Sequence, residues 1–456
     1  MTDFIIKKLP YDLSSHAGLA FIGKYLKSIK INSLIDSAFP MRSGVANSDI
    51  LKSYLGLLCL GKNDFDAIEN FRTNAFFIRA LGLSAVPSSP TLRQRLDAHA
   101  SEWFDLVPQV NQQLLASRIN GQPIDFGALA CGYTPVDLDT FAMDNSSTKK
   151  ELVGRTYAGV DGYCPLAVYL GSLGYCLELA LRALRPGVQH SAAESQYNFE
   201  SALPFAANLV ATPLLVRADS GFCSLKLMQE ITAQAKAVSR EIAFIIKWNP
   251  RRAPVETIAT QRTADARTQW TLHRPGKREC IWQDHLDLAQ VGSQANPPRR
   301  IYRLTERTID KRGGGLLLPE YVLEGWTSTL PEKFSPAEII ALYCDHATHE
   351  QFHSEFKTDM DLERLPSGKF DTNFLVCQLA AVAMNLLRLI GQNTLHEPNS
   401  PVRHAAKRRR IRTVMQEMMF KAARMIKHAG RSILGLGEKD SGFAVFERHD
   451  GQLKTA

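Results

Sequence analysis

The sequence predicts a mixed α/β fold with a central core, a β-rich insertion in that core, and helical regions at both ends. Residues 1–132 have apolar residues at helical spacing, whereas residues 133–248 contain short apolar runs of strand type separated by helical stretches. Residues 249–332 are polar and rich in strand signals. Helical patterns return in residues 333–392, and residues 393–456 form a basic region that we expect to be helical.

The composition is that of a globular protein with a polyanionic partner. The 456 residues suffice for two or three domains, and a net charge of +8 with a pI near 9.0 favours nucleic acid as that partner. The eight cysteines form no Cys-x-x-Cys pair, which indicates reduced core residues rather than zinc ligands. Because we find no signal peptide and no apolar run of about 18 residues, we expect a cytoplasmic, nucleoid-associated protein without a membrane partner.

The N-terminal region is expected to bind DNA through a short basic helix. Ser89 as N-cap and Pro90 at the first helical position predict a helix over Thr91–Ala98, which contains Arg93 and Arg95. Short helices followed by such a helix are typical of a helix-turn-helix reader of DNA. A plain helical bundle is the alternative.

The core is predicted from the order of its elements. Apolar runs bounded by turn residues predict strands, and longer amphipathic stretches predict helices. The expected elements are strands at 135–144, 163–171 and 174–184, a helix at 191–206, a strand at 213–218, a helix at 224–237 and a strand at 242–247. This is the order of a ribonuclease H-like α/β core. After the insertion, an apolar helix over Phe374–Ile390 should pack against the core.

Three carboxylates mark the candidate site. Asp139 ends one predicted strand, Asp219 ends another, and Glu350 lies on a later helix. In a ribonuclease H-like sheet the two strands are adjacent, so the two aspartates could share a metal. Hard oxygen ligands suit Mg²⁺, with Mn²⁺ as a substitute, and two such ions promote phosphodiester displacement. Asp144, in a predicted loop, is the alternative first acid.

The third acid lies in a predicted helix over 342–357. Successive steps of three or four residues keep Tyr343, His346, Glu350, His353 and Lys357 within roughly 60° of one another. An aromatic ring, imidazoles, a carboxylate and an ammonium make a poor core face. A functional site is one interpretation, and an ordinary surface helix is the other.

These motifs resemble the DDE transposases of bacterial insertion sequences, in the branch whose core contains a β insertion. That branch has a Tyr-x2-Arg-x3-Glu-x6-Lys motif, and this chain has Tyr343, His346, Glu350 and Lys357 at the same spacing, with His in place of Arg. The resemblance implies that Asp139, Asp219 and Glu350 are the catalytic, metal-binding triad. It also implies that Tyr343, His346 and Lys357 contact DNA, with His346 a weaker phosphate clamp than Arg.

The resemblance further implies cut-and-paste transposition. Such an enzyme binds the terminal inverted repeats of its element, cleaves them and joins them to target DNA, as a homodimer in the DNA complex. A nuclease of the same fold without strand transfer and a catalytically inactive DNA-binding relative are the alternatives. In better-known members a Trp of the insertion stacks on a flipped base. Trp326 and Trp282 lie in the insertion here, and Trp326 is the candidate for stacking; a buried strand Trp is the alternative.

The C-terminal region has a dense basic run. Residues 404–412 include Lys407, Arg408, Arg409 and Arg410, and further basic residues follow at helical spacing up to Arg431. In a chain of net charge +8 this pattern predicts contact with the DNA backbone. A solvated helix face is the alternative.

Overall fold

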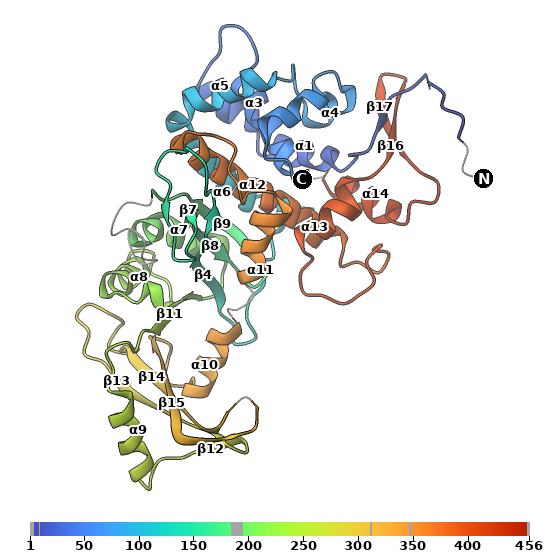
Figure 1. Cartoon of the computed structure of the whole chain (residues 1–456). Coiled ribbons are helices and arrows are strands. Elements are labelled where there is room, and N and C mark those ends of the chain that lie inside the picture. The colour runs from blue at the N-terminus through green and yellow to red at the C-terminus, as the bar shows by residue number, and fades with distance from the viewer. Residues whose placement is uncertain (1–3, 9, 184–194, 311, 346–348, 454–456) are drawn as a thin grey trace.

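The computed structural model describes residues 4–8, 10–183, 195–310, 312–345 and 349–453. Figure 1 shows the N- and C-terminal segments gathered at one end of the molecule and a β-rich arm at the other, with the core between them. The fold is therefore mixed α/β. The mainly helical part and the mainly β part lie at opposite ends of the molecule.

One sheet runs from the core into the arm. Within the described residues it has nine strands in the order β12-β13-β14-β15-β11-β10-β4-β8-β9. Their bounds, in chain order, are β4 (Thr134–Thr140), β8 (Leu166–Leu170), β9 (Tyr175–Ala180), β10 (Leu214–Ala218), β11 (Ile242–Trp248), β12 (Thr271–Arg274), β13 (Lys277–His285), β14 (Arg299–Ile309) and β15 (Gly315–Ser328).

The core half of the sheet has β4 at its centre. Strands β4, β10 and β11 are parallel, whereas β8 is antiparallel to β4 and β9 is antiparallel to β8. Helix α7 (Ser195–Leu209) precedes β10, and helix α8 (Leu225–Ala237) precedes β11. The predicted order of strands and helices in this part of the chain is therefore confirmed.

The predicted strand over 135–144 is too long. β4 ends at Thr140, and β5 (Met143–Asp144) belongs to a separate small sheet in the order β5-β7-β6, with β6 at Gly154–Arg155 and β7 at Asp161–Tyr163. A Cβ atom on Gly162 would lie 1.9 Å from the Met143 carbonyl oxygen, so only glycine permits this close pairing of backbones.

The polar strands after β11 extend the core sheet. β15 is antiparallel to β11, with Trp326 opposite Lys247, and β14 and β13 follow outward. Helix α9 (Val255–Ala264) covers this arm through a small apolar cluster that contains Ala259, Leu304 and Leu323. The arm and the core therefore share one continuous hydrogen-bonded framework.

The N-terminal region is helical, as predicted. The basic helix α5 (Ser89–His99) begins one residue earlier than expected, because the side chain of Ser88 rather than Ser89 accepts the capping hydrogen bond, from Thr91 N. The other helices are α1 (Leu19–Ser28), α2 (Ile31–Ala38), α3 (Asn47–Leu58), α4 (Ala75–Leu81) and α6 (Leu106–Leu115), with 3₁₀ turns at Phe65–Phe71 and Ser101–Trp103 and a short hairpin of β2 (Arg118–Ile119) and β3 (Gln122–Pro123).

Helix α12 (Phe370–Thr394) joins the N-terminal helices to the sheet. It is apolar and long enough to cross a membrane, but 89% of its most apolar window is buried inside the protein. The predicted packing against the core is therefore confirmed. Asn385 makes the link polar: its amide donates to Asn111 Oδ1 (2.8 Å) and Cys176 O (2.7 Å), and its Oδ1 accepts from Cys176 N (2.8 Å).

The predicted helix over 342–357 is not one helix. α10 (Pro336–Cys344) begins with the expected N-cap, where Ser335 and Glu338 form a capping box. α11 (His349–Ser354) follows as a separate element and continues into a π-helical turn over Glu355–Asp359. His346 lies outside the described residues.

The C-terminal region is not the helix that the basic spacing predicted. α13 (Ile411–Val414) and a π-helical turn (Met415–Met419) lead into a hairpin of β16 (Ala423–His428) and β17 (Arg431–Leu436), and α14 (Phe443–Gln452) ends the described chain. Ala429 and Gly430 form the two-residue loop with φ of 46° and 73°, which is typical of a hairpin turn. β1 (Leu13–Ser14) pairs with β16.

A buried ion pair ties α10 to the sheet. Arg217 of β10 and Asp137 of β4 lie opposite each other and are joined by two hydrogen bonds of 2.7 Å, with side chains 1% and 2% exposed. Arg217 Nη1 also donates to Leu342 O of α10 (2.8 Å). The last turn of α10 is thereby held over the ends of β4 and β10.

Replacing Arg217 tests this link. Arg217→Met leaves Asp137 buried without its cation and should lower the free energy of unfolding by roughly 3–5 kcal/mol in urea denaturation. The double variant Asp137→Leu/Arg217→Met should recover most of that loss. Arg155→Met is the control, because its pair with Asp161 is more than half exposed and should contribute less than about 1 kcal/mol. Equal losses in Arg217→Met and the control would contradict a structural role for the buried pair.

Asn385→Ala tests the polar link from α12 to β9. Because Cys176 N would lose its Asn385 acceptor in a buried site, while Cys176 O keeps the hydrogen bond from Asn111 (3.0 Å), we expect a loss of about 1–3 kcal/mol in the same assay. Asn393→Ala, in the same helix, removes a hydrogen bond only to its own helix, at Leu389 O, and is the matched control. The prediction is wrong if both variants unfold at the same urea concentration.

Candidate active site at the ends of β4 and β10

Asp139 and Asp219 lie side by side at the edge of the sheet. β4 and β10 are parallel neighbours, with Leu138 opposite Ala218, so the next residue on each strand is one of the two aspartates. Both follow Asp137 and Arg217 by two positions and therefore project from the same face of the sheet as the buried pair. The predicted adjacency of the two strands is confirmed.

The surroundings of Asp219 have opposing effects on the pKa of its carboxyl group. Burial raises the pKa of its carboxyl above the usual range, whereas the N–H groups of Gly221 and Phe222 and the charge of Lys247 lower it. Gly221 N lies 2.9 Å from Asp219 Oδ1, at the start of a 3₁₀ turn over Ser220–Phe222. The turn therefore holds the carboxylate in place through its backbone N–H groups.

Asp139 is contacted by a histidine of α11. Its Oδ1 accepts from Thr140 N (2.7 Å), and its Oδ2 lies 3.8 Å from Nδ1 of His353. The His353 ring is buried and stacks on Phe141 at a centroid distance of 4.5 Å. α11 is thus packed onto the carboxyl end of β4 through its imidazole.

The charges of Asp139 and Asp219 influence the pKa values of two nearby tyrosines. Burial, followed by the charges of Asp219 and Asp139, raises the pKa of Tyr343 far above its usual value. Burial also raises the pKa of Tyr157 to about 12, with Cys164 and then the same two aspartates contributing. Both phenols therefore stay protonated, and the Tyr157 hydroxyl donates to Thr140 O (3.3 Å), on the strand that carries Asp139.

The site fits a divalent metal in part. Two neighbouring carboxylates match the preference of Mg²⁺ for one or two protein carboxylates with substrate phosphates and water. Among the described residues, however, no three His, Cys, Asp or Glu side chains are grouped to hold an ion. Glu350 is exposed on α11 and is not brought to the two aspartates in this arrangement.

Asp144, the alternative first acid, does not lie at the ends of β4 and β10. Asp144 lies in β5, where its Oδ1 accepts from Ser146 N (2.8 Å), and hydrogen bonds to Ser146 lower its pKa. Its own backbone N–H donates to Glu363, which also pairs with Lys357 at 3.0 Å. Asp144 is therefore engaged in a loop motif, and Lys357, the predicted phosphate ligand, is engaged by a carboxylate.

The basic residues predicted on α5 differ in their surroundings. Arg93 is half exposed and lies over the ring of Phe65. Arg95 is turned inward and donates to Val45 O (3.1 Å) and Asn47 Oδ1 (2.7 Å). The structure therefore leaves Arg93 accessible to a partner and gives Arg95 a structural role, which corrects the expectation for Arg95.

The C-terminal basic run is mostly folded inward, which corrects the expectation of four DNA-binding side chains. Arg408 binds Glu355, a fully buried carboxylate that Arg388 of α12 also binds. Arg409 is 8% exposed and donates to Leu395 O (3.0 Å).

The remaining members of the run lie nearer the solvent. Arg410 forms a bidentate ion pair with Asp359 (2.7 and 2.8 Å) and is about half exposed, whereas Lys407 is exposed.

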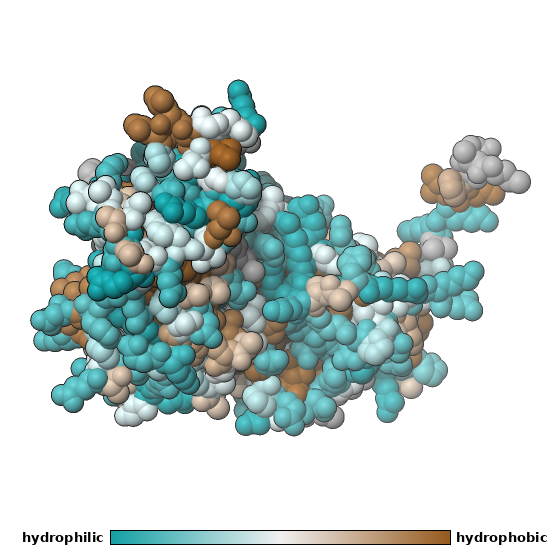
Figure 2. Space-filling view, turned by 90° about the horizontal axis from the view of Figure 1, so that it is seen from below, coloured by the Kyte–Doolittle hydropathy of each residue, from teal (hydrophilic) through white to brown (hydrophobic). Residues whose placement is uncertain are grey.

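Seen from below the view of Figure 1, the surface of the protein is mainly hydrophilic, with small separate hydrophobic patches (Figure 2).

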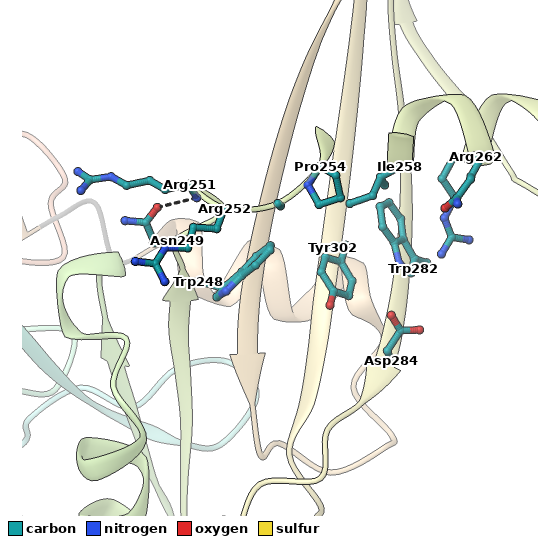
Figure 3. Close-up of a pocket in the computed structure, with 12 residues that line it drawn as sticks. Trp248, Asn249, Arg251, Arg252, Pro254, Ile258, Arg262, Trp282, Asp284 and Tyr302 are labelled. Carbon is teal, nitrogen blue, oxygen red and sulfur yellow. Dashed lines mark hydrogen bonds between the residues drawn. The ribbon is translucent and has the colours of Figure 1, made fainter. Parts of the chain in front are cut away.

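Trp326 is buried and does not offer a stacking surface. It is 1% exposed and packs near Tyr343, as the alternative interpretation held. A cavity of about 600 Å³ lies instead on the arm, between β11, β14 and α9 (Figure 3). Its walls are rich in aromatic rings and guanidinium groups: Trp248, Trp282, Tyr302, Arg251, Arg252 and Arg262.

One site feature, the buried ion pair of Asp137 and Arg217, was missed in the sequence although a signal was present. Asp137-x-Asp139 and Arg217-x-Asp219 place two pairs on one face of neighbouring strands, because alternate residues share a face. That pattern predicts a buried ion pair behind the two carboxylates. The contact of His353 with Asp139 had no such local signal.

The chain was compared with known proteins. The family model described as transposase DDE domain group 1 matches residues 11–450. No curated protein matches. Among solved structures, a piggyBac transposase synaptic complex with hairpin DNA matches 89% of this chain and 79% of its own, at 10% identity and a TM-score of 0.43, which is too low to transfer any property. The family match covers nearly the whole chain, and the chain therefore belongs to the DDE transposases of domain group 1.

Proposed function

We propose that this chain is a metal-dependent DNA transposase with a ribonuclease H-like core, encoded by a bacterial insertion sequence. It would bind the terminal inverted repeats of its element, cleave them and join them to target DNA by cut-and-paste transposition. The observation that supports this most strongly is the placement of Asp139 and Asp219 side by side at the ends of parallel strands, in a member of the DDE family. The strand order β11-β10-β4-β8-β9 with β8 antiparallel supports the ribonuclease H-like assignment.

Asp139 and Asp219 would hold Mg²⁺, or Mn²⁺ in its place. When bound, such ions activate the attacking oxygen and stabilise the leaving oxygen in phosphodiester displacement. Tyr343, beside the carboxylates, is the proposed contact to the DNA backbone, and Arg217 with Asp137 keeps α10 above them.

Glu350 is proposed as the third acid. It lies three residues before His353 on α11, and residues three apart share a helix face. Because His353 contacts Asp139 at the carboxyl end of β4, Glu350 lies on the side of α11 that is turned towards this end of the sheet. His346 and Lys357, with exposed Arg93 and Lys407, are the proposed phosphate contacts, in a homodimer on DNA at the nucleoid.

The cavity of Figure 3 is proposed to hold an unstacked nucleotide, in place of Trp326. Aromatic rings accept bases of any sequence, and guanidinium groups attract the backbone. Trp282 and Tyr302 stack at a centroid distance of 4.9 Å, and Arg262 lies 4.1 Å from the Trp282 ring. Asp284 is the one acid among the lining residues of this cavity.

Removing each carboxylate tests the active site. Asp139→Asn, Asp219→Asn and Glu350→Gln should each abolish Mg²⁺-dependent cleavage of a labelled duplex carrying the element's terminal repeat, while binding of that duplex in EDTA persists. Joining of the cleaved end to a plasmid separates a transposase from a nuclease.

Two control variants sharpen this test. Glu438→Gln, exposed in the C-terminal region, should cleave normally. Asp144→Asn should also cleave, and loss of cleavage in it with retention in Asp139→Asn would assign the first acid to Asp144. Retained cleavage in Glu350→Gln would remove Glu350 from the site. Tight binding by the wild type without any cleavage would favour an inactive relative.

Trp282→Ala tests the cavity. Because Trp282 supports both Tyr302 and Arg262 in the cavity wall, its loss should weaken binding of a short single-stranded oligonucleotide in fluorescence anisotropy, by about the 1–3 kcal/mol that one stacked base contributes. Trp270→Ala is the matched control, since Trp270 is also an arginine-covered tryptophan of the arm but does not line the cavity. Equal affinities for the two variants would contradict nucleotide binding there.

A further inference from the structure

Lys247 is the next member of the row that contains the two aspartates. β10 and β11 are parallel, with Ala218 opposite Ile246, so Lys247 lies beside Asp219 on the neighbouring strand. Asp139, Asp219 and Lys247 thus stand in one row across three parallel strands and project from one face of the sheet. The lysine is 32% exposed at this edge.

A shared carboxylate holds Lys247 in place. Its Nζ lies 3.0 Å from Oε1 of Glu324, and Oε2 of Glu324 accepts from Nε of Arg303 at 3.0 Å. One carboxylate therefore serves two cations. The group keeps a net positive charge next to the carboxylates of the active site.

Both cations lie over the buried ring of Trp326. Lys247 Nζ and Arg303 Cζ lie 6.0 and 5.2 Å from the centre of its buried ring. A ring face attracts a cation without offering it a hydrogen bond, so the ammonium keeps donors for other partners. This explains the location of Trp326 better than contact with a flipped base does.

We propose that Lys247 binds a non-bridging oxygen of the DNA phosphate that enters the site between Asp219 and the arm, while Glu324 holds the ammonium in position. This inference rests on the proposed function. An ammonium is a compact charge with three donors, so it can keep its bond to Glu324 and donate to a phosphate as well. A phosphate carries negative charge into a site that already has two carboxylates, and Lys247 offsets that charge.

The salt dependence of DNA binding tests the contact without catalysis. The terminal-repeat duplex is titrated in EDTA over a series of salt concentrations for the wild type, Lys247→Ala, Lys247→Arg and Lys277→Ala. Lys247→Ala should lower the slope of log K against log salt by about 1, because one phosphate contact is lost. Lys247→Arg should keep the slope. Lys277→Ala, in register with Arg307 at the far end of the arm, should also keep it.

Cleavage with Mg²⁺ then separates the two proposals. In single turnovers Lys247→Ala should cleave at least about tenfold more slowly than the wild type, as expected for the loss of one charge-assisted hydrogen bond. A changed slope with no cleavage by the wild type supports Lys247 and overturns the catalytic function. Normal cleavage and an unchanged slope in a folded Lys247→Ala protein overturn the role of Lys247 and leave the catalytic function standing.

Discussion

The ion pair of Asp137 and Arg217 is the constraint on which the site depends. Both groups are almost fully buried between two parallel strands, so each needs the other to remain charged there. Arg217 also binds the backbone of α10, which positions Tyr343 above the sheet. The half-buried Asp139 and Asp219 lie two residues further along the same face. The geometry of the site therefore rests on a pair that takes no part in the chemistry.

A second set of buried charges joins α11 to the C-terminal region. Glu355 and Asp359, in the turn that follows α11, bind Arg388, Arg408, Arg410 and Arg412. These two carboxylates thereby offset part of the positive charge between residues 404 and 412, where Arg410 and Arg412 stay about half exposed. The same contacts anchor the end of α11, so the helix with Glu350 and His353 is held from both the sheet and the C-terminal segment.

The two aspartates at the ends of β4 and β10 are held more firmly than Glu350 on α11. Asp139 and Asp219 are held by a continuous hydrogen-bonded sheet, whereas Glu350 lies on a short helix that is separate from α10. For the proposed function, such a division would keep the carboxylate pair in place before DNA binds, and substrate phosphates would supply further oxygen ligands to the metal. The arm adds Lys247, Glu324 and Arg303 to the same edge, because its strands continue the core sheet.

The sequence by itself determined the order of strands and helices in the core, the capping of α10 by Ser335, the burial of α12, and the adjacency of the strands that end in Asp139 and Asp219. These features follow from local periodicity, turn residues and caps. Only the tertiary structure decided the break between α10 and α11, the hairpin at Ala423–Leu436, the burial of Trp326 and the inward turn of Arg95, Arg408 and Arg409. The reason is physical: a charged or aromatic side chain looks the same in sequence whether it meets solvent or a distant buried partner, and Glu355 lies 53 residues from Arg408.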